Sequence, residues 1–325
     1  MLSISQGFQS VRTSNFDGVH NIMLNPASAV NNKTYIDINI GSGMIYFHNN
    51  FLHIPEKDFQ LKNYLFKKFK KPLYDTTVLF QDGSPFTYYP GVTDPMVRGQ
   101  IHITGPSVHF SLKRQSFSFF TAYRAAIYSD IPFDMYEVLI EGEDYLPDYN
   151  NSSILKNINT GMMLWGEAGV SYATVLNPQE LDSWYIGASL KFLSGYTSAF
   201  LHNKELTYSI DKQPNIYLNG IDSEFGFSTK SKFFKPNGYG LGMDFGIHYI
   251  KRGGYSRPTE YFNKLRDQTY KDYKYKLGFS ITDLGGIRYK KNSTMSIFYS
   301  DTSMFIEGLD KYEDMSIDSM QYILE

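Results

Sequence analysis

The sequence predicts an all-β fold, namely an antiparallel transmembrane β-barrel of about 10–14 strands with long polar inserts. The composition is the first reason: 27 Tyr, 25 Phe and 26 Gly with only 20% charged residues suit half-buried strands and tight turns. The second reason is a period-two alternation of apolar and polar residues. It runs over segments near the length of about 9–11 residues that a tilted strand needs to cross a bilayer.

The clearest alternation covers residues 238–250, where glycine and polar residues occupy one face of the expected strand. The other face is apolar and comprises Tyr239, Leu241, Met243, Phe245, Ile247 and Tyr249. Residues 183–193 and 274–281 follow the same rule. Aromatic residues such as Tyr249 and Tyr275 lie at segment ends, as an interfacial girdle requires. One face therefore suits lipid and the other suits a lumen.

A hairpin is expected in the first half of the chain, with strands 101–113 and 117–129 joined by a turn at 114–116. Gly105 and Pro106 shift the alternation within the first of these strands, as a β-bulge would. Further strands are expected near 35–47, 161–176 and 183–198, and the alternation weakens after Phe200.

The expected organisation has three parts. Residues 1–33 form an N-terminal hatch or periplasmic segment, and residues 34–300 form the barrel with long inserts near 48–98 and 130–159. The acidic segment 301–325 does not resemble a closing strand, so either the chain is truncated there or the strands are fewer than expected. Residues 1–6 are too short for a signal peptide. We therefore expect the signal peptide itself to have been removed or truncated.

A short amphipathic helix is expected at residues 62–71, and its basic run 67–71 has two interpretations. The run would contact anionic lipopolysaccharide, or it is the solvated face of the helix.

Several function classes are disfavoured. The net charge of -2 argues against a nucleic-acid partner, and the absence of cysteine removes disulfides and thiolate sites. Neither the pair His48 and His53 nor the pair His102 and His109 has metal-ligand spacing with nearby carboxylates. The chain also lacks a nucleophile elbow and a phosphate-binding loop. We therefore expect no enzyme activity, no metal and no cofactor.

The best candidate site residues are charged or polar groups on the face opposite the apolar one, because a lumen tolerates charge and lipid does not. Asp244 and His248 lead this set, although about 13 Å separates them along one strand. Arg124, Glu167 and Lys191 would supply cross-strand partners if they face the same lumen. These groups would either bind a polar solute or a plug, or simply fill a narrow lumen with salt bridges.

Short motifs carry a resemblance to a known family. They lie at residues 12–19, 24–27, 35–39, 131–142, 238–246 and 275–285, and the second of them contains Asn25-Pro26-Ala27. The chain resembles a family of outer-membrane β-barrels known only as a domain of unknown function. That family is distantly similar to FadL-like transporters and to accessory barrels of type IX secretion. The resemblance implies that Asn25, Pro26 and Ala27 belong to a hatch that enters the lumen. An ordinary Asn-Pro turn is the alternative.

We therefore expect an outer-membrane β-barrel that serves passive transport of a hydrophobic or small solute. Its partners would be outer-membrane lipid, lipopolysaccharide and other envelope proteins. The alternative is a scaffold of the cell envelope that holds a secretion-system or peptidoglycan-linked partner. A third possibility is a secreted, soluble β-sandwich that acts as a binding module, in which the alternating residues face a core instead of lipid.

Overall fold

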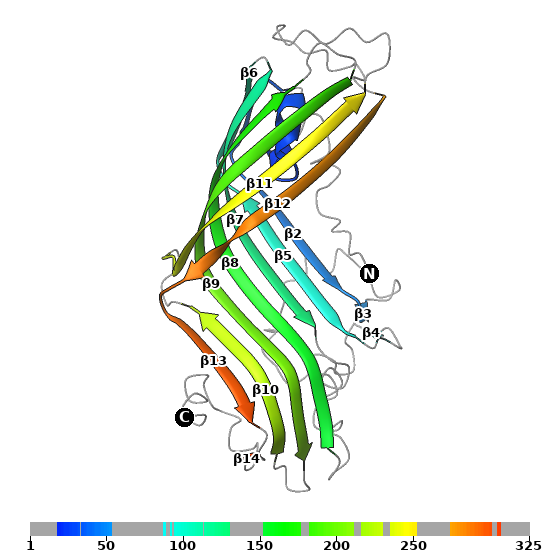
Figure 1. The fold of residues 1–325 in the computed structure, drawn as a ribbon, viewed down its shortest axis with the longest axis vertical. Coiled ribbons are helices and arrows are strands. Elements are labelled where there is room, and N and C mark those ends of the chain that lie inside the picture. Colours follow the sequence, from blue (N-terminus) through cyan, green and yellow to red (C-terminus); the bar gives the residue numbers. More distant parts are fainter. Residues whose placement is uncertain are drawn as a thin grey trace, which may run out of the picture.

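The computed structural model describes residues 18–32, 34–53, 87–88, 92, 94–112, 114–130, 152–176, 182–210, 216–229, 235–251, 274–300 and 304–306. These residues form a 12-stranded antiparallel sheet and a separate ribbon of β3 (Leu52–His53) and β4 (Thr87–Tyr88) (Figure 1). Two short helices, α2 (Val19–Ile22) and η1 (Pro26–Asn31), complete the described part. The prediction of an all-β antiparallel fold is confirmed.

The first half of the sheet contains two long strands that are each broken once. β1 (Ile36–Asn39) is followed by β2 (Ser42–Asn49), and β5 (Met96–Thr104) is followed by β6 (Ser107–Leu112). β1 pairs with β6 and β2 pairs with β5, so the two breaks lie side by side. The unbroken strand β7 (Gln115–Asp130) pairs with both β5 and β6.

The second half is built on two very long strands, β8 (Ser152–Val175) and β9 (Asp182–Ile210). The second half of β9 pairs with β10 (Ile216–Ser228), and its first half pairs with β11 (Gly238–Lys251). β11 pairs in turn with β12 (Tyr275–Tyr289). Beyond β10 lie β13 (Ser293–Ser300) and β14 (Met304–Ile306).

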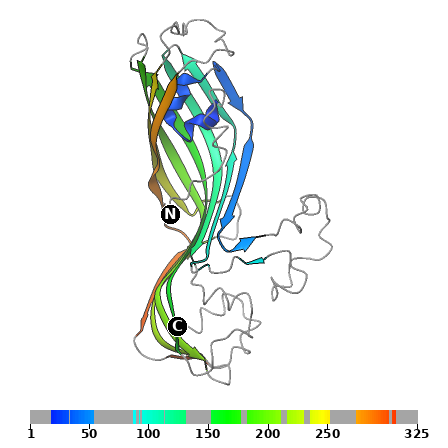
Figure 2. The same cartoon turned by 90° about the vertical axis from the view of Figure 1, so that its right-hand side faces the viewer.

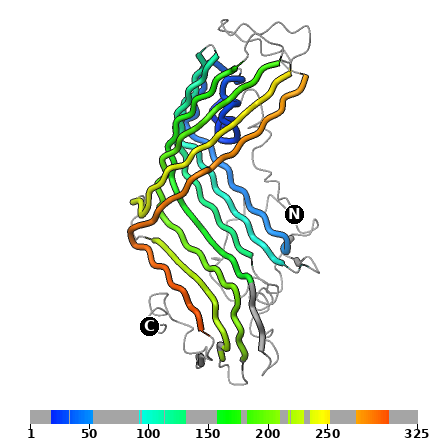
Figure 3. The backbone as a smooth tube through the Cα atoms, viewed as in Figure 1, coloured from blue at the N-terminus to red at the C-terminus, as the bar shows by residue number. Residues whose placement is uncertain are grey.

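The sheet therefore divides into two connected parts, and β8 and β9 run through both of them (Figure 3). β11 and β12 belong to one part, whereas β10, β13 and β14 belong to the other. The wall changes direction where the chain passes from β10 to β11 and from β12 to β13 (Figure 3).

The predicted bulge at Gly105-Pro106 is present as the break between β5 and β6. Ile103 is exposed before the break and Phe110 is exposed after it, although seven residues separate them and a regular strand would put them on opposite faces. The break restores the apolar residues of β6 to the exposed face. The tight turn between β6 and β7 also agrees with the predicted hairpin, but β7 begins at Gln115, two residues earlier than expected.

Two strand boundaries were predicted wrongly. β8 begins at Ser152, so the predicted insert at 130–159 extends eight residues too far. β9 continues to Ile210, well past Phe200 where the alternation weakens. In this region both faces carry polar residues, and backbone pairing with β10 defines the strand where side-chain alternation does not. The predicted helix at 62–71 lies outside the described residues, as does most of the insert at 48–98.

Among the described residues the sheet is curved but open, since β2 and β12 each pair on one side only. The closed barrel of the prediction therefore remains a proposal. One face of the sheet curls around residues 18–32, which include both helices (Figure 2). We call this segment the plug and the face it contacts the inner face; the opposite side is the outer face.

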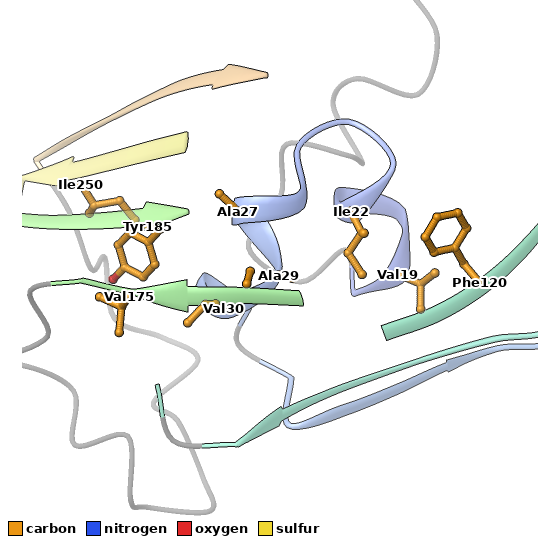
Figure 4. Close-up of a cluster of buried hydrophobic side chains, with 10 residues drawn as sticks. Val19, Ile22, Ala27, Ala29, Val30, Phe120, Val175, Tyr185 and Ile250 are labelled. Carbon is orange, nitrogen blue, oxygen red and sulfur yellow. The ribbon is translucent and has the colours of Figure 1, made fainter. Parts of the chain in front are cut away.

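The buried apolar core lies between the plug and the inner face (Figure 4). The plug contributes Val19, Ile22, Ala27, Ala29 and Val30. The wall contributes Phe120, Ala173, Val175, Tyr185 and Ile250. Because most other inward positions near the plug are glycine or polar, the plug supplies much of the apolar surface that this part of the sheet buries.

Candidate functional site

The outer face of the part that holds the plug is covered by large exposed apolar side chains. They alternate with inward residues on four neighbouring strands and include Val170, Tyr172, Ile186, Leu190, Phe192, Leu241, Met243, Phe245, Ile247, Leu277, Phe279 and Ile281. A contiguous apolar surface of this kind is rare on a soluble monomer and marks contact with protein or membrane. We call this set the apolar belt.

Aromatic rows border the belt at both ends. At one end Trp184, Tyr249 and Tyr275 stand on three neighbouring strands, with ring centroids 4.9 and 6.1 Å apart. At the other end Tyr239 stacks on Phe192 with 5.7 Å between ring centroids. Trp and Tyr suit the boundary of an apolar layer, because each ring carries a polar group that prefers water.

Beyond the belt, the far end of the sheet carries charged pairs as well as exposed apolar side chains such as Met295 and Ile297 on β13. Lys204 on β9 lies 3.2 Å from Asp222 and 3.7 Å from Glu224, both on β10. The hydrogen bond to Asp222 raises the pKa of Lys204 above its ordinary value. This end of the sheet therefore differs from the belt in its exposed charged pairs.

The plug is fastened to the wall through Asn25. Its Oδ1 accepts a hydrogen bond from the Ala27 amide at 2.9 Å, which caps η1. Its Nδ2 donates to the carbonyl oxygens of Ile247 on β11, at 3.3 Å, and Phe279 on β12, at 3.1 Å. In return, the Ser280 hydroxyl donates to the Leu24 carbonyl at 2.8 Å. Asn25 thus orders the plug and ties it to two strands at once.

Glycines in the wall form a seat beneath this contact. A Cβ at Gly187 would lie 2.5 Å from the Ala27 nitrogen, and a Cβ at Gly246 would overlap the Asn25 amide. These two glycines are direct cross-strand partners on β9 and β11. Only a residue without a side chain lets the plug backbone approach the sheet so closely. The structure thus places the predicted motif Asn25-Pro26-Ala27 in contact with the inner face.

His248 contacts the plug and does not contact Asp244. Its ring nitrogens each lie 3.3 Å from the Ser28 hydroxyl, and the ring covers Gly278 on β12. Sequence reasoning placed His248 and Asp244 on one strand face but too far apart to interact directly. The structure gives each residue a different partner.

The other four candidate residues come together on the inner face in one cluster with Asp283. The Lys191 ammonium lies 2.6 Å from Asp244 and 2.5 Å from Asp283. The Arg124 guanidinium donates to both carboxylate oxygens of Asp283, at 2.9 and 3.1 Å, and its nearest approach to Glu167 is 3.5 Å. We call Arg124, Glu167, Lys191, Asp244 and Asp283 the ion network.

The network is unevenly buried. The side chains of Glu167, Lys191 and Asp244 are at most 4% exposed, whereas that of Asp283 is 48% exposed. Arg124 also stacks over the Trp165 ring, with 5.0 Å between its guanidinium carbon and the ring centroid. A buried charge requires such partners, because removal from water without them is very unfavourable.

Sequence reasoning missed Asp283, and the reason is a bulge. Continued alternation from Ile281 would put Asp283 on the outer face with the apolar belt. A register shift between β11 and β12 instead sets two residues of β12 opposite Asp244, and Asp283 adopts a φ of 59°. This bulge turns the carboxylate inward, and the Asp283 amide donates to Asp244 at 2.7 Å. The run Asp283-Leu-Gly-Gly286 was the available signal, since bulges favour such residues.

A second polar cluster lies on the neighbouring strands β6 and β7, where the His109 ring is 2.9 Å from the Ser118 hydroxyl and 3.2 Å from the Ser111 hydroxyl. Across the described ranges, no three His, Asp or Glu side chains gather in an arrangement that could hold a metal ion. No helix within these ranges is long and apolar enough to cross a membrane.

These features define a class: an antiparallel β-sheet protein with an apolar outer belt, a charged inner face and an N-terminal segment seated against that face. The chain belongs to the family described as a family of unknown function, DUF5723, whose model matches residues 26–325. Neither the curated proteins nor the solved structures contain a match to the chain. The comparisons thus establish the family, while the similarity to FadL-like and type IX barrels remains a prediction.

Proposed function

We propose that this protein is a β-barrel of a Gram-negative outer membrane and that it serves passive transport of a hydrophobic or small solute past its plug. The height of the apolar belt carries the proposal. Tyr239 and Tyr249 lie ten residues apart on β11, one in each aromatic row. At about 3.4 Å per residue and a tilt of about 40°, these rows lie about 26 Å apart along the membrane normal.

That height matches the apolar band of outer-membrane barrels, which is about 25 Å tall between two aromatic girdles. The inner face supports the same proposal, because glycine, hydroxyl groups and the ion network suit a lumen and not a lipid contact. A β-sandwich would need a second sheet over one face. Among the described residues the plug covers only part of the inner face, while the belt remains exposed.

Charged substitutions test the proposed membrane contact. Phe245→Lys places an ammonium group near the middle of the belt and should reduce the stability of the inserted protein by about 2–4 kcal/mol. Tyr299→Lys is the matched control, since Tyr299 is 70% exposed on β13, beyond the belt. Folding into lipid vesicles at increasing urea concentrations measures both. Equal effects of the two substitutions would contradict the proposal.

A scaffold of the cell envelope is the second candidate, and the seated plug favours it. Hydrogen bonds to β11 and β12 and the glycine seat would keep the lumen closed at rest. Conductance across a planar bilayer separates the two functions. Transport predicts that Asn25→Ala, which loosens the plug, conducts more than the wild type. A scaffold predicts that both proteins insert and neither conducts.

A further inference from the structure

The ion network joins strands that are distant along the sheet. β7, which carries Arg124, is separated from β12, which carries Asp283, by the three strands β8, β9 and β11. Four strand spacings of about 4.8 Å make a path of about 19 Å along the sheet. The two side chains nevertheless meet at 2.9 Å. The sheet must therefore curl until β7 and β12 face each other, and Arg124 and Asp283 bridge the space between them.

This bridge lies next to the plug, toward the centre of the sheet. Asp244 is two residues from Gly246, which seats Asn25, and Lys191 is four residues from Gly187 on the neighbouring strand. Along β9 and β11, the network therefore follows directly on the contact between plug and wall. The Arg124–Asp283 contact therefore marks a constriction of the proposed lumen.

The surroundings of the constriction are polar. Ser189 is the cross-strand partner of both Asp244 and Ser171, and its hydroxyl has no hydrogen-bond partner among the described residues. The Asp283 carboxylate is half exposed on the same face. An apolar solute in contact with these groups would strip water from charges, which is strongly unfavourable. A small hydrated solute would keep them solvated.

The charges of the constriction are unequal. Three carboxylates, those of Glu167, Asp244 and Asp283, face two cations, those of Arg124 and Lys191. Both terminal nitrogens of Arg124 are engaged by Asp283, and the ion pair of Glu167 with Arg124 is the longer contact, at 3.5 Å. The network thus carries an excess of one negative charge, with Glu167 the least neutralised carboxylate.

We propose that the ion network is a charged constriction that admits small hydrated cations in preference to anions and to apolar solutes. This inference rests on the proposed transport function and narrows its solute class. The proposal accounts for the excess negative charge, because a network with equal numbers of positive and negative groups would stabilise the sheet equally well.

The absence of cysteine from the chain allows a direct test with one introduced thiol. Ser189→Cys places that thiol beside Asp244 with little change in volume. Two methanethiosulfonate reagents of similar size, one cationic and one anionic, then report the local potential in folded protein held in detergent micelles. Ser189 is 4% exposed, so reagents in the folded protein reach this thiol only along the proposed path of the solute. We expect both to react, and the cationic reagent to react about fivefold faster after correction for their rates with unfolded protein.

Two variants in the Ser189→Cys background identify the source of the preference. Asp283→Asn removes the excess charge and the bridge, and Glu167→Gln removes one charge while leaving the bridge intact. Each should bring the ratio of rates close to one. Asp222→Asn, at the exposed far end, is the matched control and should leave the ratio unchanged.

Failure of either reagent to modify the folded protein, or a ratio that Glu167→Gln does not alter, would overturn the proposal. Glu167→Gln also covers the case in which Asp283→Asn fails to fold. Because the experiment is done in micelles, its result does not depend on insertion into a bilayer. Failure of the protein to insert into a bilayer would instead contradict the proposed function.

Discussion

Replacing Asn25 by alanine should release the plug from the wall. The substitution removes three hydrogen bonds, to the Ala27 amide and to the carbonyls of Ile247 and Phe279. A net value of about 0.5–1.5 kcal/mol for each of the two bonds to the wall, with about 1 kcal/mol for the helix cap, gives a loss of about 2–4 kcal/mol. The loss falls on the contact between plug and sheet, so local opening of the plug should become more frequent.

Thiol protection measures that opening. Val30 is fully buried against the wall, and Val30→Cys would introduce the only thiol of the chain. A loss of about 2–4 kcal/mol corresponds to an increase of about 30- to 700-fold in the rate of modification, since about 1.4 kcal/mol is a factor of ten. The control is Asn219→Ala in the same background, because Asn219 is exposed at the far end of the sheet.

An increase below about threefold for Asn25→Ala would refute the reasoning, because one ordinary hydrogen bond would already exceed it. An equal increase for Asn219→Ala would refute it as well. In that case modification would report general unfolding and not release of the plug.

Two further predictions concern the wall. Gly187→Ala should destabilise the protein by about 1–3 kcal/mol in urea unfolding, because the added methyl group meets the backbone of Pro26 and Ala27. Gly43→Ala should not, because a Cβ at Gly43 meets nothing within 4 Å. Similar losses of stability in the two variants would show that Gly187 is not needed for the contact between plug and wall. Asp244→Asn should lower the free energy of unfolding by about 3 kcal/mol or somewhat less, because Lys191 is buried but keeps its contact with Asp283. Asp130→Asn should lower it by at most about 1 kcal/mol, because its partner Arg98 is 35% exposed. Equal costs in the same unfolding experiment would show that the network contributes no more than a surface ion pair.

The sequence was most informative where one face of a strand is buried. In β11 every second residue from Tyr239 to Tyr249 is large and apolar, so the strand and its two faces follow from the pattern. The same parity placed Asp244 and Lys191 on the inner face, where they meet. Where β9 passes Phe200, polar residues occupy both faces and the pattern no longer defines the strand.

The candidate site was only partly predictable, for two physical reasons. Asp283 reaches the network because a bulge reverses its side, and bulges depend on the register between strands, which one sequence does not contain. The glycine seat depends on the approach of residues more than 150 positions apart, Asn25 to Gly246 and Ala27 to Gly187. The residues around Gly187 and Gly246 follow the same alternation as those around other strand glycines, so the sequence does not mark these two as contacts of the plug.

The central claim is that the apolar belt faces lipid. Heat-modifiable gel mobility with circular dichroism, on protein refolded into detergent, tests it most directly. The account predicts a β-dominated spectrum and a band that shifts on boiling, with folding that requires detergent or lipid. A chain that folds as a soluble monomer without detergent would contradict the account and leave the secreted binding module as the better explanation.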